Sequence, residues 1–246
     1  MTFDDLRDAR VLITGASTGI GAAVARAFGA QGARVGVHYN ASCDPAQAVA
    51  RDIEAAGGRA RLLRADVRDP AALRAVVAEF AAAEHGLDVL INNAGGTHGR
   101  TPIEEIDDPH YDSLVDLNQR SVVVASQAAV PHLRAAGGGA IVTTSSVAAL
   151  SGGSGGLSVY AGTKGFVVSF TRALAKELAG DAIRVNAVSP GTVDTRFHEL
   201  ASTPQQLESA KGKIPMGRLG APDDLVGTFL YLASPGLSGY VTGQVI

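Results

Sequence analysis

The segment RVLITGASTGIG, residues 10–21, decides how this chain folds. Its first five residues form a short apolar run, which is typical of a buried parallel strand. Glycines follow at positions 15, 19 and 21, and from Gly19 to Gln31 apolar residues recur at helical spacing. The segment therefore predicts a strand, a tight glycine-rich turn and a helix, in that order.

The same alternation of strands and helices continues to the end of the chain. Further strands are expected at 35–39, 61–65, 87–92, 140–145, 183–188 and 240–246, and helices at 45–56, from 69 to about 80, 109–136, 160–179 and 222–233. Such alternation predicts a parallel sheet with helices on both faces. We therefore expect one doubly wound α/β domain over residues 1–246, with about seven strands. Residues 192–219 are weakly patterned, and they are the candidate for a substrate lid.

Composition excludes several classes of function. The net charge is −3 and no run of five like charges occurs, which argues against a surface for nucleic acid or anionic membranes. Cys43 is the only cysteine, and none of the six histidines forms an i,i+4 pair, so we expect no disulfide and no metal site. The N-terminus lacks a hydrophobic signal core, and no stretch approaches about 18 apolar residues. These features predict a soluble, cytoplasmic protein.

The glycine-rich turn is a candidate anion site. Glycine lets the backbone turn sharply, so that a pyrophosphate can approach the amides at the N-terminus of the following helix. The turn lacks the Lys-Ser/Thr pair of an ATP-binding P-loop. A purely structural turn is the alternative, but its position directly after the first strand favours binding of a dinucleotide.

A tyrosine and a lysine form the candidate catalytic pair. In YAGTK, Tyr160 and Lys164 are four residues apart and therefore share one face of a helix. A fixed cation favours ionisation of a phenol, whose pKa is otherwise about 10, and this enables proton transfer. Ser146 ends a strand at the ligand-binding edge of the sheet, where its hydroxyl can bind a carbonyl oxygen. The neighbouring Ser145 is the rival for this role.

Together these motifs resemble the short-chain dehydrogenase/reductase superfamily, over essentially the whole chain. The matching segments are TGASTGIG (14–21), Asp66-Val67, NNAG (92–95), Asn118, Ser146, Tyr160, Lys164, and Pro190-Gly191 with Thr195. The resemblance implies a Rossmann-type fold and an oxidoreductase that moves a hydride between NAD(P)(H) and a carbonyl/alcohol pair. The three residues between Tyr160 and Lys164 differ from the wider separation in divergent enoyl reductases.

The resemblance also implies roles for individual residues. Tyr160 is the general acid in reduction and the base in oxidation, Lys164 binds the nicotinamide ribose and lowers the pKa of Tyr160, Ser146 polarises the carbonyl, and Asn118 supports a proton relay. The SSVA context favours Ser146 over Ser145. The residues expected to contact the cofactor are Gly15, Ser17, Thr18, Gly19, Ile20, Gly21, Tyr39, Asn40, Ser42, Asp66, Val67, Asn92, Ala94, Gly95, Tyr160, Lys164, Pro190, Gly191, Val193 and Thr195.

The choice between NAD(H) and NADP(H) depends on the end of the second strand. NAD-specific folds place an acid there for the ribose hydroxyls, but residues 38–42 read HYNAS and carry no acid. They also carry no arginine or lysine to attract a 2′-phosphate. Because the acid that repels phosphate is missing, we expect NADP(H) to be favoured, with NAD(H) as the alternative.

Substrate and assembly are less well determined. His98, Arg100, Arg196 and His198 are placed to face a small polar substrate such as a ketone, sugar or hydroxy acid, although they are equally compatible with solvated loops. A 3-oxoacyl-carrier-protein reductase and a non-catalytic dinucleotide sensor are the alternatives. Family members continue past the YVTGQ segment, so we expect a C-terminal tail to be missing after Ile246. Surplus apolar residues on the helices at 109–136 and 160–179 predict a homotetramer.

Overall fold

A parallel six-stranded sheet forms the centre of the protein. The computed structural model describes residues 3–246, and for Leu200 the backbone only. The strands are β1 (Arg10–Ile13), β2 (Arg34–Tyr39), β3 (Arg59–Arg64), β4 (Val89–Asn92), β5 (Gly139–Thr144) and β6 (Ile183–Val188). Their order is β3-β2-β1-β4-β5-β6, and every neighbouring pair is parallel. The predicted doubly wound, Rossmann-type architecture is confirmed.

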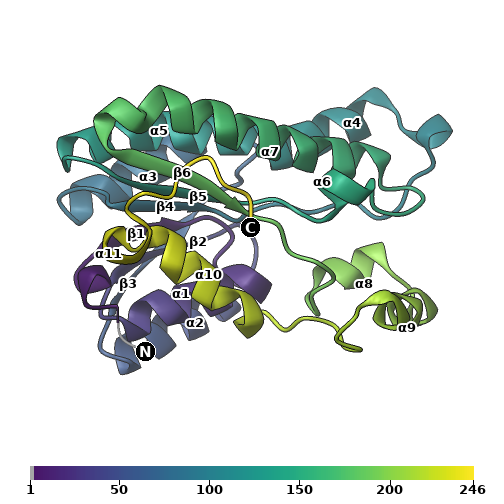
Figure 1. Ribbon diagram of the computed structural model, residues 1–246, viewed down its shortest axis with the longest axis horizontal. Coiled ribbons are helices and arrows are strands. Elements are labelled where there is room, and N and C mark those ends of the chain that lie inside the picture. The colour runs from purple at the N-terminus through teal and green to yellow at the C-terminus, as the bar shows by residue number, and fades with distance from the viewer. Residues whose placement is uncertain (1–2) are drawn as a thin grey trace.

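Helices cover both faces of the sheet (Figure 1). One face carries α1 (Gly19–Ala30), α2 (Cys43–Ala55) and α10 (Asp223–Ala233), and the other carries α3 (Pro70–Ala83), α5 (Ser121–Ala135) and α7 (Ser158–Leu178). The shorter helices are α4 (Asp108–Val115), α6 (Ala148–Ser151), α8 (Phe197–Ala201), α9 (Pro204–Lys213) and α11 (Pro235–Ser238). Within residues 3–246, no helix has both the length and the apolar character needed to cross a membrane.

Local sequence signals explain where these helices begin and which face they bury. The Asp69 carboxylate caps α3 by accepting hydrogen bonds from the amides of Ala71 (2.9 Å) and Ala72 (3.1 Å), and Pro70 occupies the first helical position. In α1, Val24 and Phe28 are four residues apart and both are buried against the sheet. Burial of a side chain of this size stabilises the fold by roughly 1.5–3 kcal/mol.

The prediction of a seventh strand at 240–246 is wrong. That segment runs beside β6, and Ala187 and Val245 form a single parallel bridge. Side chains replace part of the regular ladder, because the Thr242 hydroxyl accepts from the Val185 amide (3.0 Å) and the Asn186 amide group donates to the Val241 carbonyl (2.9 Å). The segment is therefore held to the sheet edge without forming a regular strand.

The helix predicted at 109–136 is divided by a π-helical turn at Asp116–Arg120, which separates α4 from α5. Within this turn the Asn118 side-chain amide donates to the Leu114 carbonyl at 3.0 Å. In a regular α-helix that carbonyl accepts from the backbone amide of residue 118. Here the Asn118 side chain replaces its own backbone amide as the donor. Turns of this kind often occur at functional sites.

The weakly patterned segment 192–219 contains two helices that the sequence did not predict. α9 begins with a capping box, in which the Thr203 hydroxyl accepts from the Gln206 amide (3.2 Å) and the Gln206 side chain accepts from the Thr203 amide (2.8 Å). No residue of α9 is buried, which explains why no apolar periodicity marked it. In Figure 1, α8 and α9 stand apart from the sheet at one end of the molecule.

Candidate active site

A large cleft opens at the carboxyl edge of the sheet, where β1 and β4 lead to opposite sides. Ligands of open α/β sheets bind at this switch in strand order. The cleft has a volume of about 1390 Å³, and it is lined by the glycine-rich turn, the end of β2, residues 93–96, the predicted catalytic residues Ser146, Tyr160 and Lys164, and residues 190–198. Of the predicted cofactor contacts, all except Gly21 and Asn92 line this cleft.

The glycine-rich turn leaves backbone donors free. Gly15 has a φ of +64°, and a Cβ there would lie 2.9 Å from the Ala94 Cα. Gly21 packs more tightly still, since a Cβ would approach the Gly15 carbonyl oxygen to 2.2 Å. Within residues 3–246, the amides of Thr18, Gly19 and Ile20 have no backbone acceptor. Gly21 therefore lets the helix pack against the turn, while these amides face the cleft as an anion site.

The structure corrects one predicted cofactor contact. Asn92 is buried behind the cleft, where its side chain donates to Ser126 (3.1 Å) and lies 3.5 Å from Thr143. Its neighbour Asn93 lines the cleft instead, and its amide group donates to the carbonyls of Thr14 (3.2 Å) and Gly15 (3.0 Å). Successive residues at a strand end point to opposite sides, so only one asparagine of the pair reaches the turn.

A buried histidine supports the same turn. The Gly15 amide donates to His38 Nδ1 at 3.1 Å, and His38 Nε2 lies 3.2 Å from the Ala65 carbonyl oxygen. The first contact needs an acceptor nitrogen and the second a donor, so the ring is neutral with its proton on Nε2. Burial lowers the pKa of His38 from 6.5 to about 4, which keeps the ring in this form.

The two candidate serines have different partners. Ser145 is buried, and its hydroxyl donates to the Lys164 carbonyl at 3.0 Å. Ser146 lies at the cleft, accepts from the Ala148 amide at 3.1 Å, and is close enough to Tyr160 to lower the pKa of the phenol against the effect of burial. Of the two, only Ser146 has its hydroxyl beside the Tyr160 hydroxyl.

Lys164 lies behind Tyr160 in a tightly packed setting. It is 4% exposed, and Nζ donates to the Thr144 carbonyl at 2.9 Å. Asn118 is fully buried and exchanges hydrogen bonds of 3.0 and 2.9 Å with the backbone of Gly96. A Cβ on Gly95 would lie 2.9 Å from Asn118 Oδ1 and 3.0 Å from Lys164 Nζ. Gly95 therefore allows the loop after β4 to touch both side chains.

The pKa of Tyr160 is raised, whereas the resemblance implied that Lys164 would lower it. Burial raises the pKa of Tyr160, and the hydrogen bond from Ser146 only partly opposes this effect. Burial likewise lowers the pKa of Lys164 to about 8. The expected lowering by Lys164 is absent because its ammonium lies 5.9 Å from the centre of the tyrosine ring and is hydrogen-bonded to a backbone carbonyl. In this geometry Tyr160 is held as a neutral phenol.

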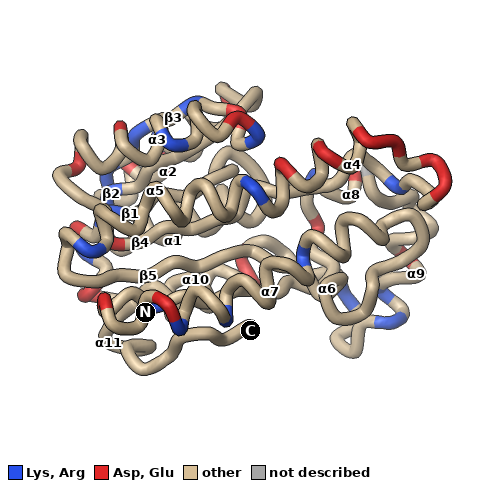
Figure 2. Tube along the Cα trace, turned by 90° about the horizontal axis from the view of Figure 1, so that it is seen from above, with Lys and Arg blue, Asp and Glu red and all other residues tan. Residues whose placement is uncertain are grey.

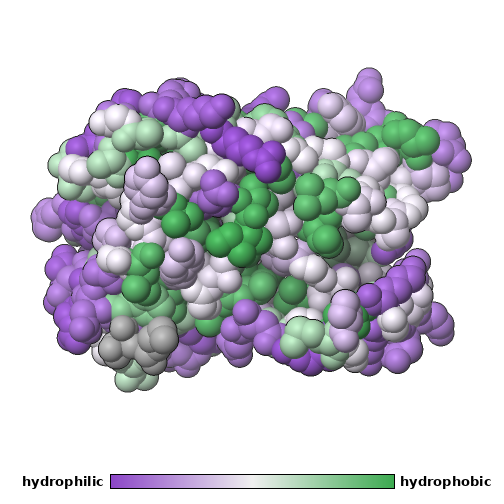
Figure 3. Space-filling model, viewed as in Figure 1, coloured by the Kyte–Doolittle hydropathy of each residue, from purple (hydrophilic) through white to green (hydrophobic). Residues whose placement is uncertain are grey.

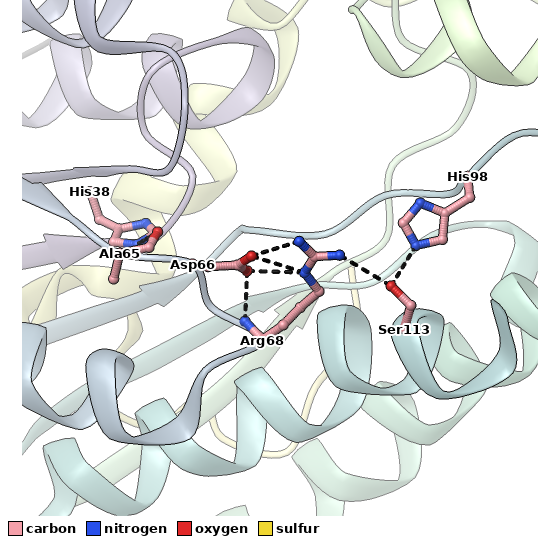
Figure 4. A network of polar contacts seen from close by, with 6 residues as sticks. All are labelled: His38, Ala65, Asp66, Arg68, His98 and Ser113. Carbon is pink, nitrogen blue, oxygen red and sulfur yellow. Dashed lines mark hydrogen bonds and ion pairs between the residues drawn. The ribbon is translucent and has the colours of Figure 1, made fainter. Parts of the chain in front are cut away.

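A polar network lies at the end of the cleft near β2 and β3 (Figure 4). The Arg68 guanidinium contacts both carboxylate oxygens of Asp66, the shortest distance being 2.6 Å, and donates to the Ser113 hydroxyl at 3.2 Å. His98 Nε2 lies 2.9 Å from the same hydroxyl. Hydrogen bonds from Arg68 and Asn40 lower the pKa of Asp66, which stays ionised. Sequence reasoning missed Arg68 because no motif includes it.

At the other end of the cleft the segment 192–219 covers the catalytic residues. The rings of Phe197 in α8 and Tyr160 are 5.3 Å apart and tilted by 45°. Arg100 ties this segment to the body of the protein: it donates to the Ala201 carbonyl (2.5 Å) and the Ser154 hydroxyl (2.6 Å). The lining of the cleft includes Arg100, Arg196 and Lys213, and among lining residues only Asp66 is acidic.

Comparison with known proteins places the chain in a family. A family model described as Enoyl-(Acyl carrier protein) reductase matches residues 15–246. The chain is 42% identical to an uncharacterized oxidoreductase of Methylorubrum extorquens, over 96% of this chain and 94% of the relative. It is 36% identical to a 3-oxoacyl-[acyl-carrier-protein] reductase of Thermotoga maritima, over 96% and 94% of the two chains.

Two solved structures are similar over nearly their whole length. An NADH-dependent reductase A1-R′ responsible for alginate metabolism is 40% identical, with a TM-score of 0.90 and coverage of 99% of this chain and 96% of that one. A short-chain dehydrogenase from Burkholderia cenocepacia in complex with NADP is 36% identical, with a TM-score of 0.91 and coverage of 98% and 96%.

The chain belongs to the family that this family model describes over residues 15–246, which lies within the short-chain dehydrogenase/reductase superfamily. It is an NAD(P)-dependent oxidoreductase that acts on carbonyl or CH–OH groups. The cleft fits a nicotinamide dinucleotide, because the amides at the start of α1 lack backbone acceptors and the glycines leave room beside them. The resemblance drawn from the sequence motifs is therefore confirmed at the level of family and cofactor class.

Proposed function

We propose that the enzyme reduces the carbonyl group of a small polar substrate, with Tyr160 as the proton donor. The observation that carries this proposal is the position of the Tyr160 hydroxyl. It lies beside the Ser146 side chain, with the Lys164 ammonium 5.9 Å from the centre of its ring, at the carboxyl edge of the sheet inside the cleft. A phenol and a hydroxyl beside each other form a donor pair for an oxygen that gains negative charge during reaction.

The proposed reaction moves one hydride and one proton. A nicotinamide held in the cleft would supply the hydride that reduces the carbonyl carbon. Tyr160 then gives its hydroxyl proton to the carbonyl oxygen, while Ser146 donates a hydrogen bond to that oxygen. Lys164 would bind the nicotinamide ribose and stabilise the tyrosinate left behind, and Asn118 would support the proton relay that reprotonates Tyr160. Oxidation runs these steps in reverse.

The direction in which burial shifts the pKa of Tyr160 favours reduction. Burial raises the pKa of Tyr160, so the residue carries a proton at neutral pH and is ready to act as an acid. Oxidation needs the tyrosinate and therefore needs either a higher pH or a closer ammonium group. We infer that reduction is the faster direction near neutral pH.

Charge in the cleft supports an acidic substrate, such as a sugar acid or a hydroxy acid. Arg100, Arg196 and Lys213 line the cleft around Tyr160, and the single acidic lining residue, Asp66, is paired with Arg68. Arg196 lies 3.5 Å from the Glu199 carboxylate, so a substrate carboxylate in this region gains chiefly from Arg100 and Lys213. The similarity to a reductase responsible for alginate metabolism supports the same class of substrate.

A 3-oxoacyl-carrier-protein reductase is the second candidate, because relatives at 34–36% identity carry that name. Surface charge speaks against it. Glu104, Glu105, Asp107 and Asp108 follow directly after the cleft residues His98 and Arg100 and form the acidic group around α4 (Figure 2). An acidic carrier protein would be repelled there.

One screen tests these candidates. Purified enzyme is assayed with NADPH and with NADH against keto sugar acids, neutral ketoses, simple ketones and acetoacetyl thioesters, with oxidation of the nicotinamide as the signal. We expect the highest kcat/KM with keto acids. Highest activity with the thioester supports the carrier-protein candidate, and tight cofactor binding without turnover on any compound supports a dinucleotide sensor instead.

The cofactor preference and the lid complete the proposal. We infer that NADP(H) is favoured, because the end of β2 carries no acid and the carboxylate of Asp66 is already occupied by Arg68. We also infer that residues 192–219 act as a substrate lid, because Phe197 in this segment touches Tyr160 and α9 buries nothing. An exposed helix with few contacts can move at low cost.

A further inference from the structure

The end of β2 is accompanied by an arginine that comes from another strand. β2 and β3 pair in parallel with Tyr39 opposite Arg64, the last residue of β3. The Arg64 side chain is exposed, and its Nε donates to the Asn40 carbonyl at 3.3 Å. A guanidinium group therefore lies at the end of β2, where dinucleotide folds select between a ribose hydroxyl and a 2′-phosphate.

This guanidinium has its charge available. Within residues 3–246, no carboxylate lies within ion-pair distance of Arg64, and its two terminal nitrogens make no hydrogen bond to protein. Arg68, which lines this end of the cleft while Arg64 lies beyond its lining, is bound to both oxygens of Asp66. Its charge is therefore offset locally, whereas that of Arg64 is not.

Neighbouring groups add to the attraction for an anion. Ser42 precedes the 13-residue helix α2, and its side chain makes no capping hydrogen bond, so the hydroxyl is free. The N-terminus of α2 favours negative charge through its dipole. The competing carboxylate is Asp44 in the first turn of α2, and it forms no ion pair within the described residues.

We propose that Arg64 is the residue that recognises the 2′-phosphate of NADP(H), with the Ser42 hydroxyl as a second donor. The proposal rests on the NADP(H) preference proposed above. Arg64 is then the cation that residues 38–42 lack. The planar guanidinium with both terminal nitrogens free is suited to bidentate binding of a phosphate, which a neutral side chain cannot reproduce.

The test measures binding of adenosine fragments by titration calorimetry, so that no substrate is needed. Adenosine 2′,5′-bisphosphate and adenosine 5′-monophosphate differ only by the phosphate in question. Arg64→Gln is compared with the matched control Arg61→Gln, which changes an exposed arginine of the same strand that pairs with Glu84. Loss of a charge-assisted contact predicts at least roughly tenfold weaker binding of the bisphosphate to Arg64→Gln.

Each outcome decides one point. The inference is supported if Arg64→Gln weakens binding of the bisphosphate while binding of the monophosphate and the behaviour of Arg61→Gln stay within about twofold of wild type. If wild type prefers the bisphosphate and Arg64→Gln keeps that preference, the assignment of Arg64 is overturned while the NADP(H) preference stands. If wild type binds both fragments equally, the NADP(H) preference itself is wrong. Unchanged monophosphate binding excludes misfolding as the cause.

Discussion

Replacing His38 tests whether a neutral, buried imidazole holds the glycine-rich turn in place. In His38→Gln the side chain retains both an acceptor and a donor, but it cannot be protonated at mildly acidic pH. The wild-type ring bridges the Gly15 amide and the Ala65 carbonyl, at 3.1 and 3.2 Å. Protonation places a hydrogen on Nδ1 and removes the acceptor for Gly15.

The size and sign of the effect follow from the pKa of His38. Folding lowers it from 6.5 to about 4, so between these pH values the unfolded chain binds more protons than the folded chain. Above pH 6.5 the imidazole is neutral in both states and His38 does not oppose folding. As the pH falls from 6.5 towards 4 the unfolded state gains protons, and the free energy of unfolding decreases. At about 1.4 kcal/mol for each tenfold change in proton affinity, the full loss is roughly 3 kcal/mol.

The assay is chemical unfolding at a series of pH values for wild type and His38→Gln. The wild-type free energy of unfolding should fall by up to about 3 kcal/mol more than that of the variant between pH 6.5 and 4. Other groups titrate equally in both proteins, so their contribution cancels in the difference. Parallel curves would refute a buried neutral His38.

Four further predictions concern the site and the assembly. Tyr160→Phe should lower kcat by roughly 10²–10⁴-fold with cofactor affinity nearly unchanged, because only the proton donor is lost; a kcat near wild type contradicts the mechanism. Oxidation by wild type should rise with pH until Tyr160, whose pKa burial raises, loses its proton, and a flat profile from about pH 6 to 10 with chemistry rate-limiting argues against that role. Asn40→Asp should shift kcat/KM towards NADH by roughly tenfold or more, since the new carboxylate repels a 2′-phosphate; a wild type that is already strongly NAD-specific contradicts the expectation. Light scattering at micromolar concentration should give the mass of a homo-oligomer, most simply a tetramer, and a monomeric mass refutes it.

The oligomer prediction depends on less surface than the sequence indicated. Several of the apolar residues that were expected to need a partner, among them Val122, Val124 and Val167, are buried within one chain. What is left is a smaller hydrophobic area in the middle of the face that carries the C-terminus (Figure 3). Phe166, Phe170 and Val245 pack against one cluster while only partly buried. This area is the candidate interface.

The fold class follows from the amino-acid sequence, and most of the site residues predicted from it line the cleft. Short apolar runs and period-3.6 patterns are local properties, so the alternating strands and helices follow from neighbouring residues alone. The glycine-rich turn and the YAGTK segment lie within single elements, and they predicted Gly15, Tyr160 and Lys164 at the cleft. Local rules failed for α9, which buries nothing and therefore carries no apolar pattern.

Relations between residues that are distant in the chain depend on the tertiary structure. Ser145 and Ser146 have different surroundings because the Ser145 hydroxyl donates to the Lys164 carbonyl whereas Ser146 lies beside Tyr160, and this depends on how α7 lies against β5. Arg64 reaches Asn40 because the register of β2 and β3 sets them side by side although 24 residues separate them. Strand register and helix packing are set by the whole core, and no short segment of sequence contains that information.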